Sequence, residues 1–139
     1  MTLVGFYVVQ TSDSGQRLRV AARLADKAFQ RGHRIFIHAT DEAQATELNE
    51  FLWSFRPASF LPHGLHGREH SESIAIGWGQ EPDNHNDLLI NLQLEIPSFF
   101  SRFARVAEVV TQEPDSLAAL RKSWTFYKER GYQLEKHDL

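Results

Sequence analysis

Leu3-Val4-Gly5-Phe6-Tyr7-Val8-Val9-Gln10 is the stretch that decides the fold, because it is a short and continuous apolar run. Such a run is typical of a strand buried on both faces, as in a parallel sheet. A turn rich in capping residues follows at 11–15, and apolar residues then recur at helical spacing from Leu18 to Phe29. Arg31-Gly32 ends this predicted helix, with glycine at the usual C-terminal position.

The next segment repeats this pattern. Arg34–His38 is a second predicted strand, and Asp41 with Gln44 can form a capping box for a second helix. The order strand, helix, strand, helix predicts an α/β fold with a parallel sheet and right-handed crossovers. The second helix is expected to turn four apolar side chains inward: Ala45, Leu48, Phe51 and Leu52.

The rest of the chain is predicted to alternate in the same way. Residues 57–73 are irregular, and two short strands follow at Ile74–Trp78 and Leu88–Leu92. Pro97 can open a helix, and a final helix is expected from about Leu117 to Arg130, where Gly131 stops it. The buried stripe of the Pro97 helix would consist of Phe99, Phe100, Phe103, Val106, Ala107 and Val110.

Length and composition limit the classes of protein. The 139 residues fit one domain spanning 1–139, and the absence of cysteine excludes disulfides and thiolate metal sites. Fifteen Lys and Arg against 18 Asp and Glu give a net charge of −3, which argues against a dedicated DNA-binding protein. There is neither a basic signal region at Met1–Gly5 nor an apolar run of about 18 residues. We therefore expect a soluble, cytoplasmic protein without membrane contact.

An α/β sheet invites a nucleotide-site interpretation, but the necessary residues are missing. The loop at 10–15 has one glycine, whereas a dinucleotide fingerprint needs three. The P-loop pattern and the nucleophile elbow are also absent. Asp41 stands roughly where a ribose-binding acid would sit, but without the glycines the cap is the favoured role. A small α/β nucleotide-binding enzyme of unknown substrate remains the alternative.

Three histidines, His63, His66 and His70, lie close together in the irregular segment. Zinc sites do use several histidines. Here prolines and glycines interrupt the segment, so no helix aligns the three rings, and no acidic ligand stands at a diagnostic spacing. Surface histidines are the favoured interpretation.

Two other groups of residues are typical of protein recognition. Trp53, Phe55 and Phe60 crowd a helix-to-loop junction, which suits an exposed binding hot spot. The alternative is that all three rings point into the core. Near the C-terminus, Arg121, Trp124 and Lys128 share one helical stripe, and Lys122 lies beside it. This set suits a peptide with a carboxylate and an aromatic side chain, or else a solvated cationic face with Trp124 turned inward.

Several motifs in order along the chain resemble those of the chi subunit of bacterial DNA polymerase III holoenzyme. They span nearly the whole chain, and the combined aromatic and Pro-His motif is not a generic α/β feature. The matching stretches are Phe6-Tyr7, Leu52-Trp53, 59–63 (SFLPH), 87–92 (DLLINL) and 127–134 (YKERGYQL).

The resemblance implies a Rossmann-like fold that has lost its nucleotide-binding loop, no cofactor and no active site of its own. Chi proteins are accessory subunits associated with the clamp loader. They join the psi subunit to the acidic C-terminal tail of the single-stranded-DNA-binding protein during DNA replication. The resemblance therefore implies only indirect contact with DNA. In some bacteria a repair helicase uses the same face as psi.

Carried over residue by residue, Trp53 and Phe60 match the aromatic residues that contact psi. Arg121 matches the basic residue that receives the terminal carboxylate of the tail, and Val110 matches an apolar wall of that pocket. Trp124 stands where the family usually has Tyr or Phe. The family's second lysine, expected near Ala118, is missing, so Lys122 or Lys128 would replace it. Besides the enzyme alternative, a second alternative function is a module that binds nucleic acid directly. The net charge of −3 argues against it.

Overall fold

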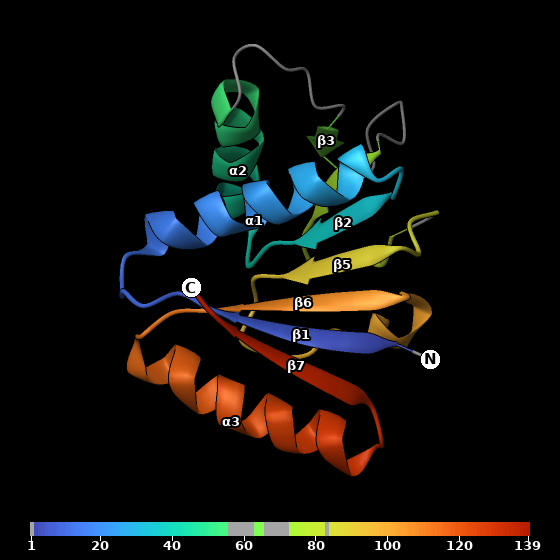
Figure 1. Ribbon diagram of the computed structural model, residues 1–139. Helices are drawn as coiled ribbons and strands as arrows, with labels where there is room; N and C mark the ends of the chain where they lie inside the picture. Colours follow the sequence, from blue (N-terminus) through green and yellow to red (C-terminus); the bar gives the residue numbers. More distant parts are fainter. Residues whose placement is uncertain (1, 56–62, 66–72, 83) are drawn as a thin grey trace.

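The structure, a computed structural model, describes residues 2–55, 63–65, 73–82 and 84–139. These residues form a seven-stranded sheet in the order β3-β4-β2-β5-β6-β1-β7, with every neighbouring pair parallel (Figure 1). The predicted class, an α/β Rossmann-like parallel sheet with flanking helices, is confirmed. The strands are β1 (Leu3–Val8), β2 (Ile35–His38), β3 (His63–Leu65), β4 (Ile74–Gly77), β5 (Leu88–Asn91), β6 (Arg105–Val110) and β7 (Gln133–Asp138).

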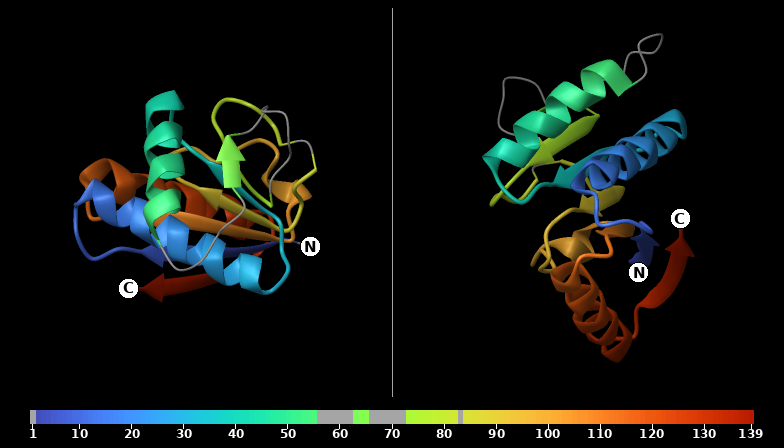
Figure 2. Two further views of the ribbon diagram at one scale, coloured as in Figure 1. Left: turned by 90° about the horizontal axis from the view of Figure 1, so that it is seen from above. Right: turned by 90° about the vertical axis from the view of Figure 1, so that its left-hand side faces the viewer.

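The three α-helices divide between the two faces of the sheet. α1 (Ser14–Gln30) and α2 (Glu42–Phe55) cover one face, and α3 (Pro114–Glu129) covers the other, as Figure 2 shows in its right-hand view. Alternate side chains of a strand point to opposite faces. Ile35 and Ile37 of β2 therefore pack in the core under α1 and α2, whereas Phe36 packs in the core on the α3 side.

The helix ends follow the chemistry read from the sequence. The carboxylate of Asp13 accepts a hydrogen bond from the backbone N–H of Gly15 at 2.9 Å and so caps α1. At α2 the Asp41 carboxylate accepts from the N–H of Gln44 at 2.8 Å, and the Gln44 side chain accepts from the N–H of Thr40 at 2.7 Å. Asp41 is thus a helix cap, as predicted. No helix in the described ranges is long and apolar enough to cross a membrane.

One predicted helix is wrong. The stretch after Pro97 forms a short 3-10 helix at Phe100–Arg102 and then strand β6, which lies between β5 and β1. The apolar residues match helical spacing by coincidence. Three of the six residues of β6 are valine, which favours strands, and a central strand of a parallel sheet is apolar on both faces.

Besides β6, two further strands were not predicted, and one helix starts earlier than expected. β7 is a polar edge strand without an apolar run, and β3 has only three residues, in a stretch expected to be irregular. α3 begins at Pro114, not near Leu117, because proline is favoured in a first helical turn. The interpretation of the three histidines as surface loop residues is wrong for His63, which lies in β3 and is buried, whereas His66 and His70 lie outside the described residues.

Candidate protein-binding surfaces

Trp53 lies in the last turn of α2, and its side chain is 59% exposed. Its ring rests on the ring of His63 in β3, with centroids 4.7 Å apart and planes tilted by 60°. His63 is itself held by Asn49, whose carbonyl oxygen lies 3.2 Å from the His63 Nε2. We call the exposed ring of Trp53 on its His63 support the Trp53 surface.

The outward orientation predicted for this aromatic group is confirmed for Trp53. An aromatic ring more than half exposed on an ordered helix is uncommon as a core residue and common as a binding anchor. Phe60, the second residue of the predicted psi site, lies outside the described residues. α2 packs against β3 and β4, so the Trp53 surface lies at the β3 edge of the sheet (Figure 1).

The second candidate, the α3 surface, consists of Arg121, Lys122, Trp124 and Lys128. The three cations are exposed and Trp124 is half-buried. At 3.6 residues per turn, Arg121 and Lys128 point in nearly the same direction and Trp124 about 60° away. Lys122 points about 100° from Arg121 on the other side. The structure therefore brings Arg121, Trp124 and Lys128 into one stripe, with Lys122 on the neighbouring one.

Trp124 and Val110 connect this surface to the core. The Trp124 ring packs on Phe6 of β1, with centroids 5.2 Å apart, so one part of it is buried and the other faces solvent. Val110 at the end of β6 is only 5% exposed. It borders a hollow of about 10 Å³ with Phe6 and Leu120, and neither Arg121 nor Trp124 lines that hollow. A pocket shared by Val110, Arg121 and Trp124 stays a prediction.

A buried polar cluster holds α3 on the sheet. Tyr127 donates its hydroxyl hydrogen to one carboxylate oxygen of Glu108 at 2.8 Å. The side-chain amide of Asn91 donates to the other oxygen at 2.9 Å. Glu108 is fully buried, and burial raises its pKa to about 7 although both donors oppose the rise. Burial likewise raises the pKa of Tyr127, with the Glu108 carboxylate adding to the rise.

Arg17 of α1 reaches the same region from the opposite side. It donates to the backbone carbonyl of Leu92, and burial lowers its pKa while the charges of Glu113 and Glu108 oppose the change. Neither Glu108 nor Arg17 was singled out from the sequence, and Asn91 and Tyr127 were noted only as parts of longer motifs. The signal in the sequence was a polar residue inside an apolar strand run, namely Asn91 in β5 and Glu108 in β6. Because 105–110 was predicted to be helical, Glu108 was not recognised as a buried strand residue.

The described residues give little support for a metal site or for a nucleotide phosphate site. No group of three or more His, Asp and Glu side chains there could hold a metal ion. In the loop after β1, where a nucleotide phosphate would bind, the Asp13 carboxylate accepts from the backbone N–H of Gly15 in the first turn of α1. A carboxylate in that place competes with a phosphate for the same donors.

The comparisons with known proteins identify the family. The family model described as DNA polymerase III chi subunit, HolC, matches residues 1–135. The chain belongs to the chi-subunit family of DNA polymerase III. A chi subunit of Pseudomonas aeruginosa is 48% identical over 139 residues, covering 100% of this chain and 98% of the relative. The chi subunit of Escherichia coli is 32% identical over 120 residues, covering 84% and 81%. The chain is thus a replication accessory subunit related to DNA polymerase III.

Solved structures support the fold alone. T4 UvsW superimposes with a TM-score of 0.69 at 8% identity, covering 99% of this chain and 41% of that one. The Mss116p DEAD-box helicase domain 2, solved bound to an RNA duplex, gives a TM-score of 0.63 at 12% identity, covering 97% and 64%. At such identities only the parallel α/β arrangement is shared.

Proposed function

We propose that this chain is a non-catalytic bridge within the polymerase III complex. Its Trp53 surface, together with Phe60, would bind the psi subunit. Its α3 surface would bind the acidic C-terminal tail of the single-stranded-DNA-binding protein, through which the chain would meet DNA. A repair helicase would compete for the Trp53 surface. A replication subunit of this kind would act in the cytoplasm.

One observation carries the proposal: two exposed groups suited to protein recognition lie on elements far apart in the fold. The Trp53 surface is on α2 at the β3 edge, whereas α3 packs on the opposite face, near β6 and β7 (Figures 1 and 2). Two partners can therefore be bound at once without a shared residue.

The α3 surface suits a peptide that ends in an aromatic residue. The planar guanidinium of Arg121 can hold the terminal carboxylate with two parallel hydrogen bonds. The solvent side of the Trp124 ring offers apolar contact for the aromatic side chain. Lys128 and Lys122 would attract acidic residues further along the peptide, and salt should screen this attraction.

A non-catalytic role is supported by the loop after β1. The loop has a single glycine, and the Asp13 carboxylate occupies the backbone N–H of Gly15 at the start of α1, where a phosphate would need such donors. Nucleoside triphosphate hydrolysis by the pure protein would instead favour the enzyme alternative.

The proposal is tested by measuring both affinities by calorimetry for two variants. Trp53→Ala should weaken psi binding about thirtyfold or more, because a central aromatic anchor contributes roughly 2–4 kcal/mol. Arg121→Ala should remove most binding of the tail peptide. Each variant should leave the other affinity unchanged.

Matched controls come from α1. Arg19 and Arg23 are exposed arginines that belong to neither proposed surface, so Arg19→Ala and Arg23→Ala should change neither affinity. Loss of both affinities in one variant, or tail binding that survives Arg121→Ala, would contradict the placement of the two surfaces.

A further inference from the structure

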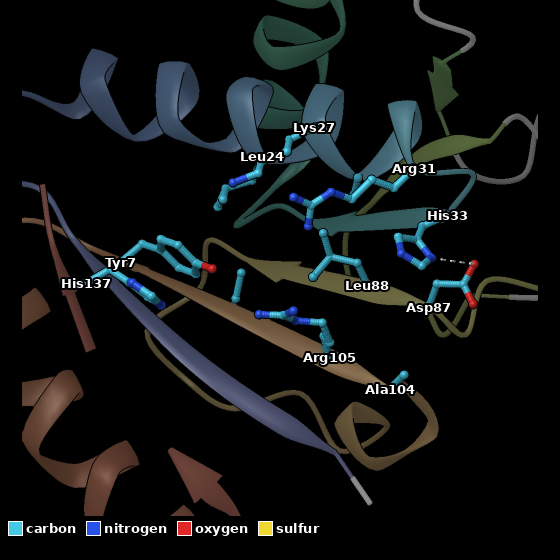
Figure 3. A pocket seen from close by; sticks show the side chains of 12 residues that line it. Tyr7, Leu24, Lys27, Arg31, His33, Asp87, Leu88, Ala104, Arg105 and His137 are labelled. Atoms are coloured by element: carbon cyan, nitrogen blue, oxygen red, sulfur yellow. Dashed lines mark ion pairs between the residues drawn. The ribbon is translucent and has the colours of Figure 1, made fainter. Parts of the chain in front are cut away.

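A pocket on the α1 face of the sheet is not used by either proposed surface. It has a volume of about 280 Å³ and lies between the C-terminal half of α1 and strands β1, β5, β6 and β7 (Figure 3). Its floor includes Tyr7, Ala107 and His137, which alternate with residues that face α3. Among the strands, α1 packs mainly against β2, β5 and β6. It does not cover β1 and β7 to the same extent, and the pocket opens above these two strands.

Cationic side chains from two elements converge on this pocket. Lys27 and Arg31 reach down from α1, and Arg105 reaches across from β6 toward the Tyr7 hydroxyl (Figure 3). Within the described part of the chain, the side chains of Lys27 and Arg31 make no ion pair or hydrogen bond. Lys27 and Arg31 therefore bring charges to the pocket that no side chain of the described residues neutralises. Arg105 forms an ion pair of 3.8 Å with Glu135, whose carboxylate also lies 3.3 Å from His137 Nε2.

The local charge is opposite to that of the whole chain. Three cations line the pocket against one carboxylate, Asp87, in a protein of net charge −3. Asp87 accepts from the backbone N–H of Arg34 at 2.7 Å and lies 4.0 Å from Nδ1 of His33, which also lines the pocket. Asp87 also sits at the far end of the pocket from Tyr7 in Figure 3.

Lys27 and Arg31 also have an ordinary structural explanation. Cations near a helix C-terminus stabilise the helix dipole, and these two lie in the last turn and at the C-cap of α1. Arg105 comes from a strand, and this explanation does not extend to it. An anion bound between the guanidinium groups of Arg31 and Arg105 would be attracted by both of them.

The uncharged part of the pocket indicates what the anion is attached to. Leu24, Leu88, Ala28 and Ala107 form an apolar lining, and the Tyr7 ring stacks on His137 with centroids 4.6 Å apart. The volume is near the lower end of the range for ligand pockets, about 300–1,000 Å³. A ligand that fits has one anionic group and one compact apolar or aromatic part.

We propose that this pocket binds the phosphate group of a nucleotide, with the guanidinium groups of Arg31 and Arg105 on the phosphate oxygens. Lys27 adds charge, and the Tyr7 hydroxyl donates a hydrogen bond. The apolar lining receives the sugar or base. For a replication subunit the nucleotide is either free or part of a single strand, and both sources present the same chemistry. The site is separate from the α3 surface, because α3 lies on the other face, and it shares no residue with the Trp53 surface.

The test uses the full chain and two probes at low salt, thymidine monophosphate by calorimetry and a fluorescent oligothymidylate by polarisation. Inorganic phosphate serves as the competitor. Arg31→Gln and Arg105→Gln should each weaken binding about tenfold, since a hydrogen bond to a charged group is lost. Tyr7→Phe should weaken it less. Arg23→Gln removes an exposed arginine of α1 outside the pocket and should leave binding unchanged.

Binding of the mononucleotide, reduced by Arg31→Gln and competed by phosphate, would support the proposal with a free nucleotide as the ligand. Binding of the oligonucleotide alone, with the same sensitivity, would support it with a strand as the ligand and show direct contact with DNA. No binding of either probe would overturn it. So would binding that Arg23→Gln weakens as much as Arg31→Gln, because this would indicate attraction to surface charge only. Unchanged thermal unfolding of the variants checks that each one folds.

Discussion

The Trp53 surface and the α3 surface are supported by the fold in different ways. Trp53 is more than half exposed and rests on one ring, His63. On α3, the ring of Trp124 packs on Phe6, and the helix beneath it is tied to the sheet through Tyr127 and Glu108. A binding residue can therefore be removed from α2 at little cost to folding, whereas the α3 surface shares its support with the core.

The largest effect expected from this difference is on stability. Phe6 is fully buried and contacts both Trp124 and Tyr127. Phe6→Ala should lower the free energy of unfolding by about 3–5 kcal/mol, because it leaves a cavity under α3. Trp53→Ala should change it by less than about 1 kcal/mol, since the ring is exposed. Urea unfolding of both variants is the measurement, and similar losses would remove the distinction between the two surfaces.

A smaller effect is expected on how the free energy of unfolding depends on pH, through the buried cluster under α3. The folded-state pKa of Glu108 is raised to about 7, above its ordinary value of 4.5. Between these values the folded state binds more protons than the unfolded state, so the contribution of Glu108 to stability falls as pH rises through this window. Above it, the buried carboxylate costs up to about 3 kcal/mol relative to a neutral group.

Glu108→Gln replaces the carboxylate by a neutral side chain of the same shape. The variant should match the wild type at pH 4 and exceed it in stability at pH 8, as measured by urea unfolding at a series of pH values. Glu129→Gln, which alters an exposed carboxylate of α3, is the control and should show no such divergence. Parallel pH profiles for Glu108→Gln and the wild type would mean that hydrogen bonds in the buried cluster fully offset the cost of burying the charged carboxylate.

The same comparison explains which parts of the fold could be predicted. β1, α1, β2 and α2 have apolar runs and caps that agree with each other, as with Asp41 and Gln44, and these elements were predicted correctly. β6 was missed because its apolar spacing also fits a helix. β7 was missed because an edge strand contacts a neighbour on one side only and needs no apolar run.

Some candidate sites could be predicted from the sequence and others could not. The exposed stripe of α3 follows from helical spacing, so Arg121, Trp124 and Lys128 could be grouped from the sequence. The pocket between α1 and β6 could not, because Arg31 and Arg105 are far apart in the chain and meet only through the strand order. The Glu108 cluster depends on the same pairing of β5 with β6.

The smallest expected effects separate the two lysines of the α3 surface. Lys128 points nearly in the direction of Arg121, whereas Lys122 points about 100° away from it. A peptide held by Arg121 and Trp124 should therefore pass closer to Lys128. Lys128→Ala should weaken tail binding by about 0.5–1 kcal/mol and Lys122→Ala by less, as is usual for exposed ion pairs. Calorimetry at two salt concentrations is the measurement, and the effect of Lys128→Ala should shrink at the higher one because salt screens exposed charges. A larger loss from Lys122→Ala would mean that the peptide crosses α3 on its other flank, away from the stripe shared by Arg121 and Lys128.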